Sequence, residues 1–278
     1  MTENNLLYQH ANIFYRSTGK GKRVMLLHGF AEDGSIWENQ IAFLKNHFRL
    51  LIPDIPGSGR SELIPDGDIA TYTEVIKAII ADDLQRQGNE GSEEITMIGH
   101  SMGGYIALAF AEKYPQQLAA FGLFHSTAFA DNEEKKLARA KAILFIKDKG
   151  SNPFLQTSIP GLFSQAFATN YPAEINKLIN KAKNFSPHAL IQYYEAMIQR
   201  PDRTEVLKKF PKPILFIIGE KDNVIPLQSS LQQCYLPAQA HIHILAKSAH
   251  MGMLEETEKS NKILYNFLKL KEMSCKSM

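Results

Sequence analysis

Short runs of apolar residues recur along the chain, and each ends in a Gly, Asp or Pro that is followed by more polar sequence. The clearest are VMLLHG at 24–29, RLLIPD at 49–54, EITMIG at 94–99 and PILFIIG at 213–219. They are apolar at successive positions, without the alternation of a half-exposed strand, so they predict strands buried on both faces of a parallel sheet.

Helical periodicity separates these runs. In residues 71–88, isoleucines and a leucine recur at spacings of three and four, and Gly88 marks the end of the pattern. We expect further strands at 6–17, paired as a hairpin with the segment before residue 24, at 118–126 and at 240–246, and a last helix at about 255–270. This alternation of strands and helices predicts an α/β fold.

The pattern changes between residues 127 and 207, where strand-like runs vanish and helical segments punctuated by Gly and Pro take over. We expect an all-helical cap at 127–207, inserted into an α/β core made of 1–126 and 208–278. The charged run NEEKKLARAK at 132–141 is interpreted as the solvated face of a cap helix.

Composition narrows the function classes. The 278 residues are 44% hydrophobic, with 31 Lys and Arg against 29 Asp and Glu, so the net charge of +2 gives no electrostatic reason to expect nucleic acid or an anionic membrane as partner. No secretion signal or membrane span is apparent, and we expect a cytoplasmic protein. Cys234 and Cys275 have no CxxC partner, and no HExxH motif or Cys/His cluster occurs, so neither disulfide, metal nor other cofactor is expected.

Ser101 lies in the stretch GHSMGG at 99–104, where a predicted strand passes into a predicted helix. A Gly-x-Ser-x-Gly sequence in this context is typical of a nucleophile elbow. Gly99 and Gly103 allow the strand and helix to approach closely around a strained serine at the amino end of the helix, where the dipole favours developing negative charge.

The chain resembles the α/β-hydrolase fold superfamily, in its branch of esterases, lactonases and cofactor-free haloperoxidase-like enzymes with a helical cap. The resemblance covers nearly the whole chain and rests on the landmarks LLHGF at 26–30, DIPGSGRS at 54–61, GHSMGG at 99–104, GEKDNVIP at 219–226 and SAHMGMLEE at 248–256. It implies a mostly parallel eight-stranded sheet flanked by helices, and a chain order of nucleophile, acid and histidine.

That order assigns the general base and the acid. His250 follows the strand at 240–246 in a loop that resembles the family's histidine loop, whereas His241 and His243 share one face of that strand and are expected to be sheet residues. The loop after residue 219 offers Glu220 and Asp222, and the family spacing to a following proline favours Asp222, with Glu220 expected in solvent. The alternative position for the acid, after residue 126, has no carboxylate before Asp131.

The resemblance further implies an oxyanion hole made by the backbone NH groups of Phe30 and Met102. His28 is expected to brace the Phe30 loop through hydrogen bonds. Ser58 is not a nucleophile candidate, because its glycines are adjacent to it.

We therefore expect a serine hydrolase that cleaves a small to medium, mostly apolar carboxylic ester through Ser101, His250 and Asp222. The same triad also supports enol-lactone, thioester or C–C bond cleavage and perhydrolysis. A dehalogenase or epoxide hydrolase needs an aspartate at position 101. A non-catalytic ligand receptor is the other class of hypothesis, and the complete set of catalytic residues favours the enzyme.

The substrate is the least determined part, and oligomeric state stays open. No arginine cluster suggests an anion site, although Arg60 or His125 could bind one polar group. Possible lining residues of the pocket are Phe30, Trp37, Phe124, Phe154, Leu155, Leu162, Phe163, Phe167, Tyr193, Tyr194 and Met197.

Overall fold

A single eight-stranded sheet organises the computed structural model, which describes residues 1–88 and 94–274. Its spatial order is β1-β2-β4-β3-β5-β6-β7-β8. The strands are β1 (Thr2–Tyr8), β2 (Ala11–Thr18), β3 (Arg23–Leu27), β4 (Arg49–Pro53), β5 (Ile95–His100), β6 (Leu118–Phe124), β7 (Ile214–Gly219) and β8 (Ala240–Leu245). From β4 to β8 all neighbours are parallel, which confirms the predicted fold class.

The central strands are buried on both faces, as their continuous apolar runs predict. Every residue of β3 and of β7 is buried. Apolar side chains on both faces require helices on both sides of the sheet, and this is the reason that the fold has three layers.

The amino-terminal hairpin differs from the prediction. The segment 6–17 contains two strands, because the chain reverses at Gln9 and His10, both of which have positive φ. β2 then pairs antiparallel with β4, and not with the segment before β3. The expected hairpin partner was therefore wrong.

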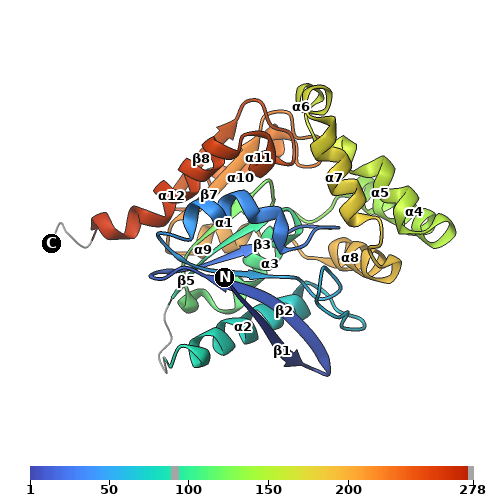
Figure 1. Cartoon of the computed structure of the whole chain (residues 1–278). Helices are drawn as coiled ribbons and strands as arrows, with labels where there is room; N and C mark the ends of the chain where they lie inside the picture. The colour runs from blue at the N-terminus through green and yellow to red at the C-terminus, as the bar shows by residue number, and fades with distance from the viewer. Residues whose placement is uncertain (89–93, 275–278) are drawn as a thin grey trace.

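Two layers of helices cover the sheet (Figure 1). The core helices are α1 (Glu38–Leu44), α2 (Ile69–Arg86), α3 (Met102–Lys113), α10 (Leu227–Cys234), α11 (Gly252–Glu255) and α12 (Thr257–Ser274). α2 packs beside α3, and α1 packs beside α12. The last helix begins two residues later than expected, and its apolar stripe at Ile263, Leu264, Phe267 and Leu268 is buried.

Between β6 and β7 the chain forms a series of helices. They are α4 (Glu133–Lys149), α5 (Ser151–Ser158), α6 (Gln165–Asn170), α7 (Pro172–Ala182), α8 (Pro187–Gln199) and α9 (Thr204–Lys209), with a short 3-10 helix, η3 (Pro160–Leu162). Helices α4 to α8 gather at one side of the molecule, whereas α9 lies apart from them and packs beside α3 (Figure 1). We keep the name cap for residues 127–207. The boundary at 207 falls within α9, and the division of the chain into core and cap stays a prediction.

Two expectations from the sequence concern membrane-spanning helices and the two cysteines. No helix within residues 1–88 and 94–274 is long and apolar enough to cross a bilayer. Cys234 is a free, buried thiol, and burial raises its pKa to about 11. Cys275 lies outside the described residues.

Candidate active site

Ser101 stands at the junction of β5 and α3, where the sequence places a nucleophile elbow. Its φ of 49° and ψ of −115° put a non-glycine residue in a sparsely populated backbone region. The backbone is held there by its own NH, which donates to Phe124 O, and by the Ser126 hydroxyl, which donates to Ser101 O at 2.7 Å. The turn is tight because a Cβ on Gly99 would lie 2.3 Å from the backbone of Gly103.

His250 and Asp222 are brought together from loops that follow β8 and β7. Nδ1 of His250 donates to Oδ2 of Asp222 at 2.8 Å, and Oδ1 of the same carboxylate accepts from the backbone NH groups of Val224 and Ile225. Burial alone raises the pKa of Asp222, but the nearby His250 and its hydrogen bond outweigh it and hold the pKa at about 2. Asp222 is therefore a carboxylate at neutral pH and fixes the tautomer of His250.

The rejected candidates lie where the sequence places them. Glu220 is exposed and pairs with Lys221. His241 and His243 are half-buried on one face of β8, and the ring of His241 packs against Phe267 of α12. They are therefore sheet residues on a face covered by a helix.

His125 lies beside Asp222 and does not line the cavity. Its Nε2 accepts from the NH of Gly252 at 3.1 Å, so the proton of the neutral ring is on Nδ1, which faces Asp222 Oδ2 at 3.6 Å. Burial keeps the pKa of His125 well below its usual value. The expectation that His125 could bind a polar group of the substrate is wrong, because the ring is buried and absent from the cavity wall.

His28 braces the loop after β3 as predicted. Its Nδ1 donates to Gly29 O, and its Nε2 accepts from the NH of Ile55 at 2.9 Å. These two bonds tie the loops that follow β3 and β4 to each other.

A second buried histidine, His100, joins this loop to the histidine loop. Its Nε2 donates to the backbone oxygen of His250 at 2.9 Å, and its Nδ1 lies 3.0 Å from Oε2 of Glu32, which also accepts from the NH of Gly29. Burial opposes both charges, but each partner outweighs it: the pKa of Glu32 is lowered and that of His100 is raised. This ion pair was not predicted from the sequence, although His100 is the residue between Gly99 and Ser101 in the Gly-x-Ser-x-Gly motif.

The two expected oxyanion donors flank Ser101. Met102 is the first residue of α3, so its NH has no partner within the helix. Phe30 lines the cavity, and its ring stacks on Tyr194 of α8 with centroids 4.3 Å apart. The position of both residues suits the role, which stays a prediction.

A cavity of about 540 Å³ lies between the core and the cap, and both Ser101 and His250 line it. Its size suits a small molecule. Of the lining residues expected from sequence, Phe30, Leu155, Leu162, Tyr194 and Met197 reach the cavity wall. The backbone NH of His250 donates to Leu162 O of the cap at 2.9 Å, so the histidine loop and the cap are in direct contact. Among the residues described, no group of three His, Cys, Asp or Glu side chains is placed to hold a metal ion.

The chain matches the family model of the alpha/beta hydrolase fold over residues 22–257. It belongs to the alpha/beta hydrolase fold family. This alpha/beta hydrolase is 24% identical to a 2-hydroxy-6-oxononadienedioate/2-hydroxy-6-oxononatrienedioate hydrolase of Paraburkholderia phymatum, over 92% of this chain and 90% of the relative. It is 22% identical to a pimeloyl-[acyl-carrier protein] methyl ester esterase of Methylococcus capsulatus, over 92% of this chain and 98% of the relative.

Among solved structures, a thermophilic esterase from Thermogutta terrifontis, studied with malate bound, matches this alpha/beta hydrolase with a TM-score of 0.87. The two are 26% identical, and the match covers 97% of this chain and 98% of the other. The family and these relatives identify the protein as an enzyme of the hydrolase class, which confirms the sequence prediction at that level.

Proposed function

We propose that this hydrolase cleaves a small to medium carboxylic ester through a Ser-His-Asp triad and an acyl-enzyme. Ser101 is the nucleophile, His250 the general base and Asp222 the residue that orients the base. The NH groups of Phe30 and Met102 bind the oxyanion. The 2.8 Å bond between His250 Nδ1 and Asp222, in a loop that shares its cavity with Ser101, is the observation that carries the proposal.

The chemistry follows from the protonation states. With the proton of neutral His250 held on Nδ1 by Asp222, Nε2 is free to accept the proton of the Ser101 hydroxyl as the oxygen attacks the ester carbonyl. The imidazolium then gives this proton to the leaving alcohol, and an acyl group stays on Ser101. Water, activated by the same Nε2, hydrolyses the acyl-enzyme and regenerates the hydroxyl.

Ester cleavage is preferred because an esterase stands among the most similar sequences and also among the most similar structures. C–C bond cleavage, lactone opening and thioester hydrolysis would use the same triad. A screen of esters, lactones, thioesters and vinylogous diketones of graded length separates these reactions. The proposal expects the largest kcat/KM among the esters.

The nucleophile is tested by Ser101→Ala on 4-nitrophenyl esters of short acids. We expect kcat to fall on the order of 10⁴-fold or more, as removal of the nucleophile does in other serine hydrolases. Ser229→Ala, a matched change on α10, should keep the parent rate. A fluorophosphonate should label Ser101 in the parent, and parental activity in Ser101→Ala would refute the assignment.

A further inference from the structure

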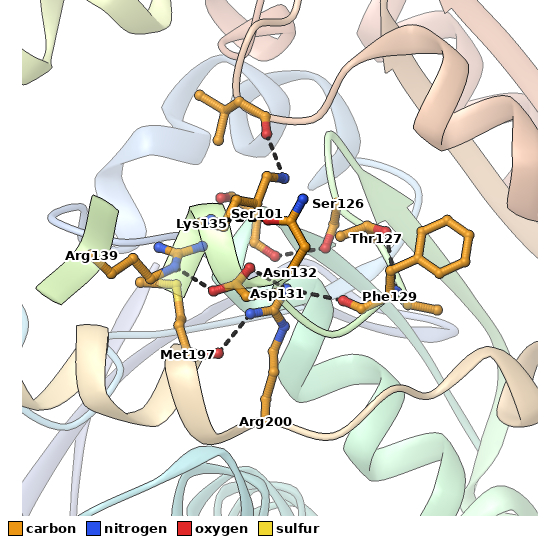
Figure 2. A network of polar contacts seen from close by, with 12 residues as sticks. Ser101, Ser126, Thr127, Phe129, Asp131, Asn132, Lys135, Arg139, Met197 and Arg200 are labelled. Carbon is orange, nitrogen blue, oxygen red and sulfur yellow. Dashed lines mark hydrogen bonds and ion pairs between the residues drawn. The ribbon is translucent and has the colours of Figure 1, made fainter. Parts of the chain in front are cut away.

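A buried carboxylate in the cap holds two arginines. Asp131 is 4% exposed, its Oδ2 accepts from Nε of Arg139 at 2.6 Å, and its Oδ1 accepts from a terminal nitrogen of Arg200 at 2.9 Å. The arginines approach the carboxylate from different directions (Figure 2). Since both carboxylate oxygens are occupied by two cations, the cluster carries one positive charge in excess.

The two arginines differ in how their remaining donors are used. Arg200 is buried, donates to the backbone oxygens of Met197 and Phe129, and lies over the ring of Tyr105 at 4.0 Å. Arg139 bonds through Nε alone, and its two terminal amino groups have no hydrogen-bond acceptor in the part of the chain that the structure describes. Arg139 lines the cavity, so these donors are available to a ligand that binds there.

The ion pairs of the cavity wall also point to Arg139 as the cation that could bind an anionic ligand. Within residues 1–88 and 94–274, the lysines and arginines of the wall are Arg60, Arg139 and Lys181. Arg60 pairs with Glu3 at 2.8 Å, and Lys181 pairs with Asp33 at 2.9 Å. Each of these two has a carboxylate of its own, whereas Arg139 shares one with a second arginine. The excess positive charge is therefore located at Arg139.

A second cation, Lys135, lies near Arg139 but does not itself line the cavity. Lys135 precedes Arg139 by four residues and lies on the same face of α4. Its Nζ donates to the backbone oxygen of Val224 at 3.1 Å, and no carboxylate among the described residues pairs with it. The interpretation of 132–141 as a solvated face is therefore wrong for Lys135 and Arg139, which face inward from the charged run.

Arg139 and Ser101 line the same cavity. Tyr105 lies four residues after Ser101, about 6 Å along the helix, and lines the same cavity as Arg139. The side chains of Arg60 and Lys181 are 56% and 45% exposed, whereas that of Arg139 is 16% exposed. Arg139 is thus the least exposed of the three lysine and arginine side chains on the described cavity wall.

We propose that Arg139 binds a free carboxylate on the acyl part of the substrate, so that the substrate is the mono-ester of a short dicarboxylic acid. The planar guanidinium presents two donors to the two oxygens of a carboxylate. This specificity rests on the proposed esterase function. It revises the sequence-based expectation of a mostly apolar acyl group, since the cavity wall includes the cation Arg139.

The test compares monomethyl with dimethyl esters of succinate, glutarate and adipate, measured by methanol release. In each variant the readout is the ratio of kcat/KM for the monoester to kcat/KM for the diester, so any general loss of activity cancels. The parent should prefer the monoester, and Arg139→Met should lower the ratio about 10-fold to 100-fold, the range of a charge-assisted hydrogen bond. Arg139→Lys should restore part of the ratio.

Lys149→Met, an exposed change on the same helix, is the matched control and should keep the parental ratio. An unchanged ratio in Arg139→Met overturns the proposal, and so does a ratio that falls in Lys181→Met instead. A second measurement needs no turnover. Glutarate should bind to Ser101→Ala in a calorimetric titration, and this binding should be lost when Arg139→Met is added.

The two proposals can fail separately. If glutarate binds in this way but the parent cleaves no ester, the esterase proposal fails and the carboxylate site stands. If esters are cleaved but Arg139→Met leaves the ratio unchanged, the carboxylate site fails and the esterase proposal stands.

Discussion

Glu32 is the residue through which the loop carrying Phe30 is connected to the histidine loop. Its carboxylate accepts from Gly29 and pairs with His100, which in turn binds the backbone oxygen of His250. Removing the charge takes away the group that favours the protonated form of His100, and it weakens the bonds from Glu32 to His100 and to Gly29. The loop that we propose as half of the oxyanion hole would lose its fixed position.

We therefore expect Glu32→Gln to lower kcat about 10-fold to 100-fold with a small change in KM, because displacement of a catalytic group by about 1 Å can cost 10²-fold in rate. Glu220→Gln, an exposed neighbour of the proposed acid, should behave as the parent. Steady-state kinetics on a short ester measures both. An equal loss in both variants, or a loss only in KM, would contradict a positioning role for Glu32.

At the residue scale the sequence was informative where a motif constrains the backbone. Ser101, Asp222 and His250 were predicted because glycine spacing and chain order mark them, and the structure brings Asp222 and His250 into contact. Arg139 was missed because its direction depends on how α4 packs on the core. The charged run at 132–141 does not show by its composition which face of α4 is turned inward. The only hint is that Lys135 and Arg139, four residues apart, lie on one face of the helix.

At the scale of elements, the junction of β5 and α3 depends on backbone contact that only glycine permits. A Cβ at Gly99 would lie 2.3 Å from the carbonyl of Gly103, where no flexible side chain can move away. Such overpacking costs about 1–3 kcal/mol in a well-packed core. The contact sets the angle at which the helix leaves the strand.

Gly99→Ala should lower the free energy of unfolding by about that amount, measured by urea denaturation, together with the rate at which the protein hydrolyses the esters proposed as substrates. Gly161→Ala is the matched change, because a Cβ there meets nothing within 4 Å. Its stability should stay within about 0.5 kcal/mol of the parent. Equal stability of the two variants would show that the close approach is not needed.

The strands that are most deeply buried were the ones whose bounds the sequence predicted best. The strands β3, β4, β5, β6 and β7 carry continuous apolar runs and lie within one or two residues of the expected ranges. The hairpin of β1 and β2 was misassigned because its turn uses Gln9 and His10 in the left-handed region, without the glycine or asparagine that normally marks such a turn.

For the whole molecule, buried carboxylates make stability depend on pH. The folded pKa of Asp222 is about 2, below the usual value near 3.8, so folding favours its ionised form. This contribution is complete above about pH 5 and is lost as the pH falls through the folded pKa. The loss amounts to about 1 kcal/mol between pH 5 and pH 3 and about 2 kcal/mol once the pH is below both values.

The free energy of unfolding of the parent should accordingly fall more steeply between pH 5 and pH 3 than that of Asp222→Asn, which has no such group to titrate. The slope is the readout, because the variant is less stable at every pH through loss of the His250 bond. Asp148→Asn, at an exposed site, should keep the parental slope. Parallel curves for the parent and Asp222→Asn would rule out this contribution.

The cap is the part of the molecule that sequence determines least. Turn residues and periodicity predict that the cap is helical. How its helices pack on the core depends on contacts between segments far apart in the sequence, such as the ion pair of Lys181 with Asp33. The wall of the cavity was therefore predicted only in part. Five of the expected residues reach it, while Tyr193 and Trp37 are buried away from it.

The hydrogen bond from the NH of His250 to Leu162 O has a consequence for the timing of the reaction. A movement that lifts η3 to admit a substrate breaks this bond and leaves the histidine loop without one of its restraints, at a cost of about 1 kcal/mol. If His250 is the base, as we propose, opening of the cap would loosen the loop that holds the base. We therefore expect His250 to be best positioned when the cap is closed over the substrate.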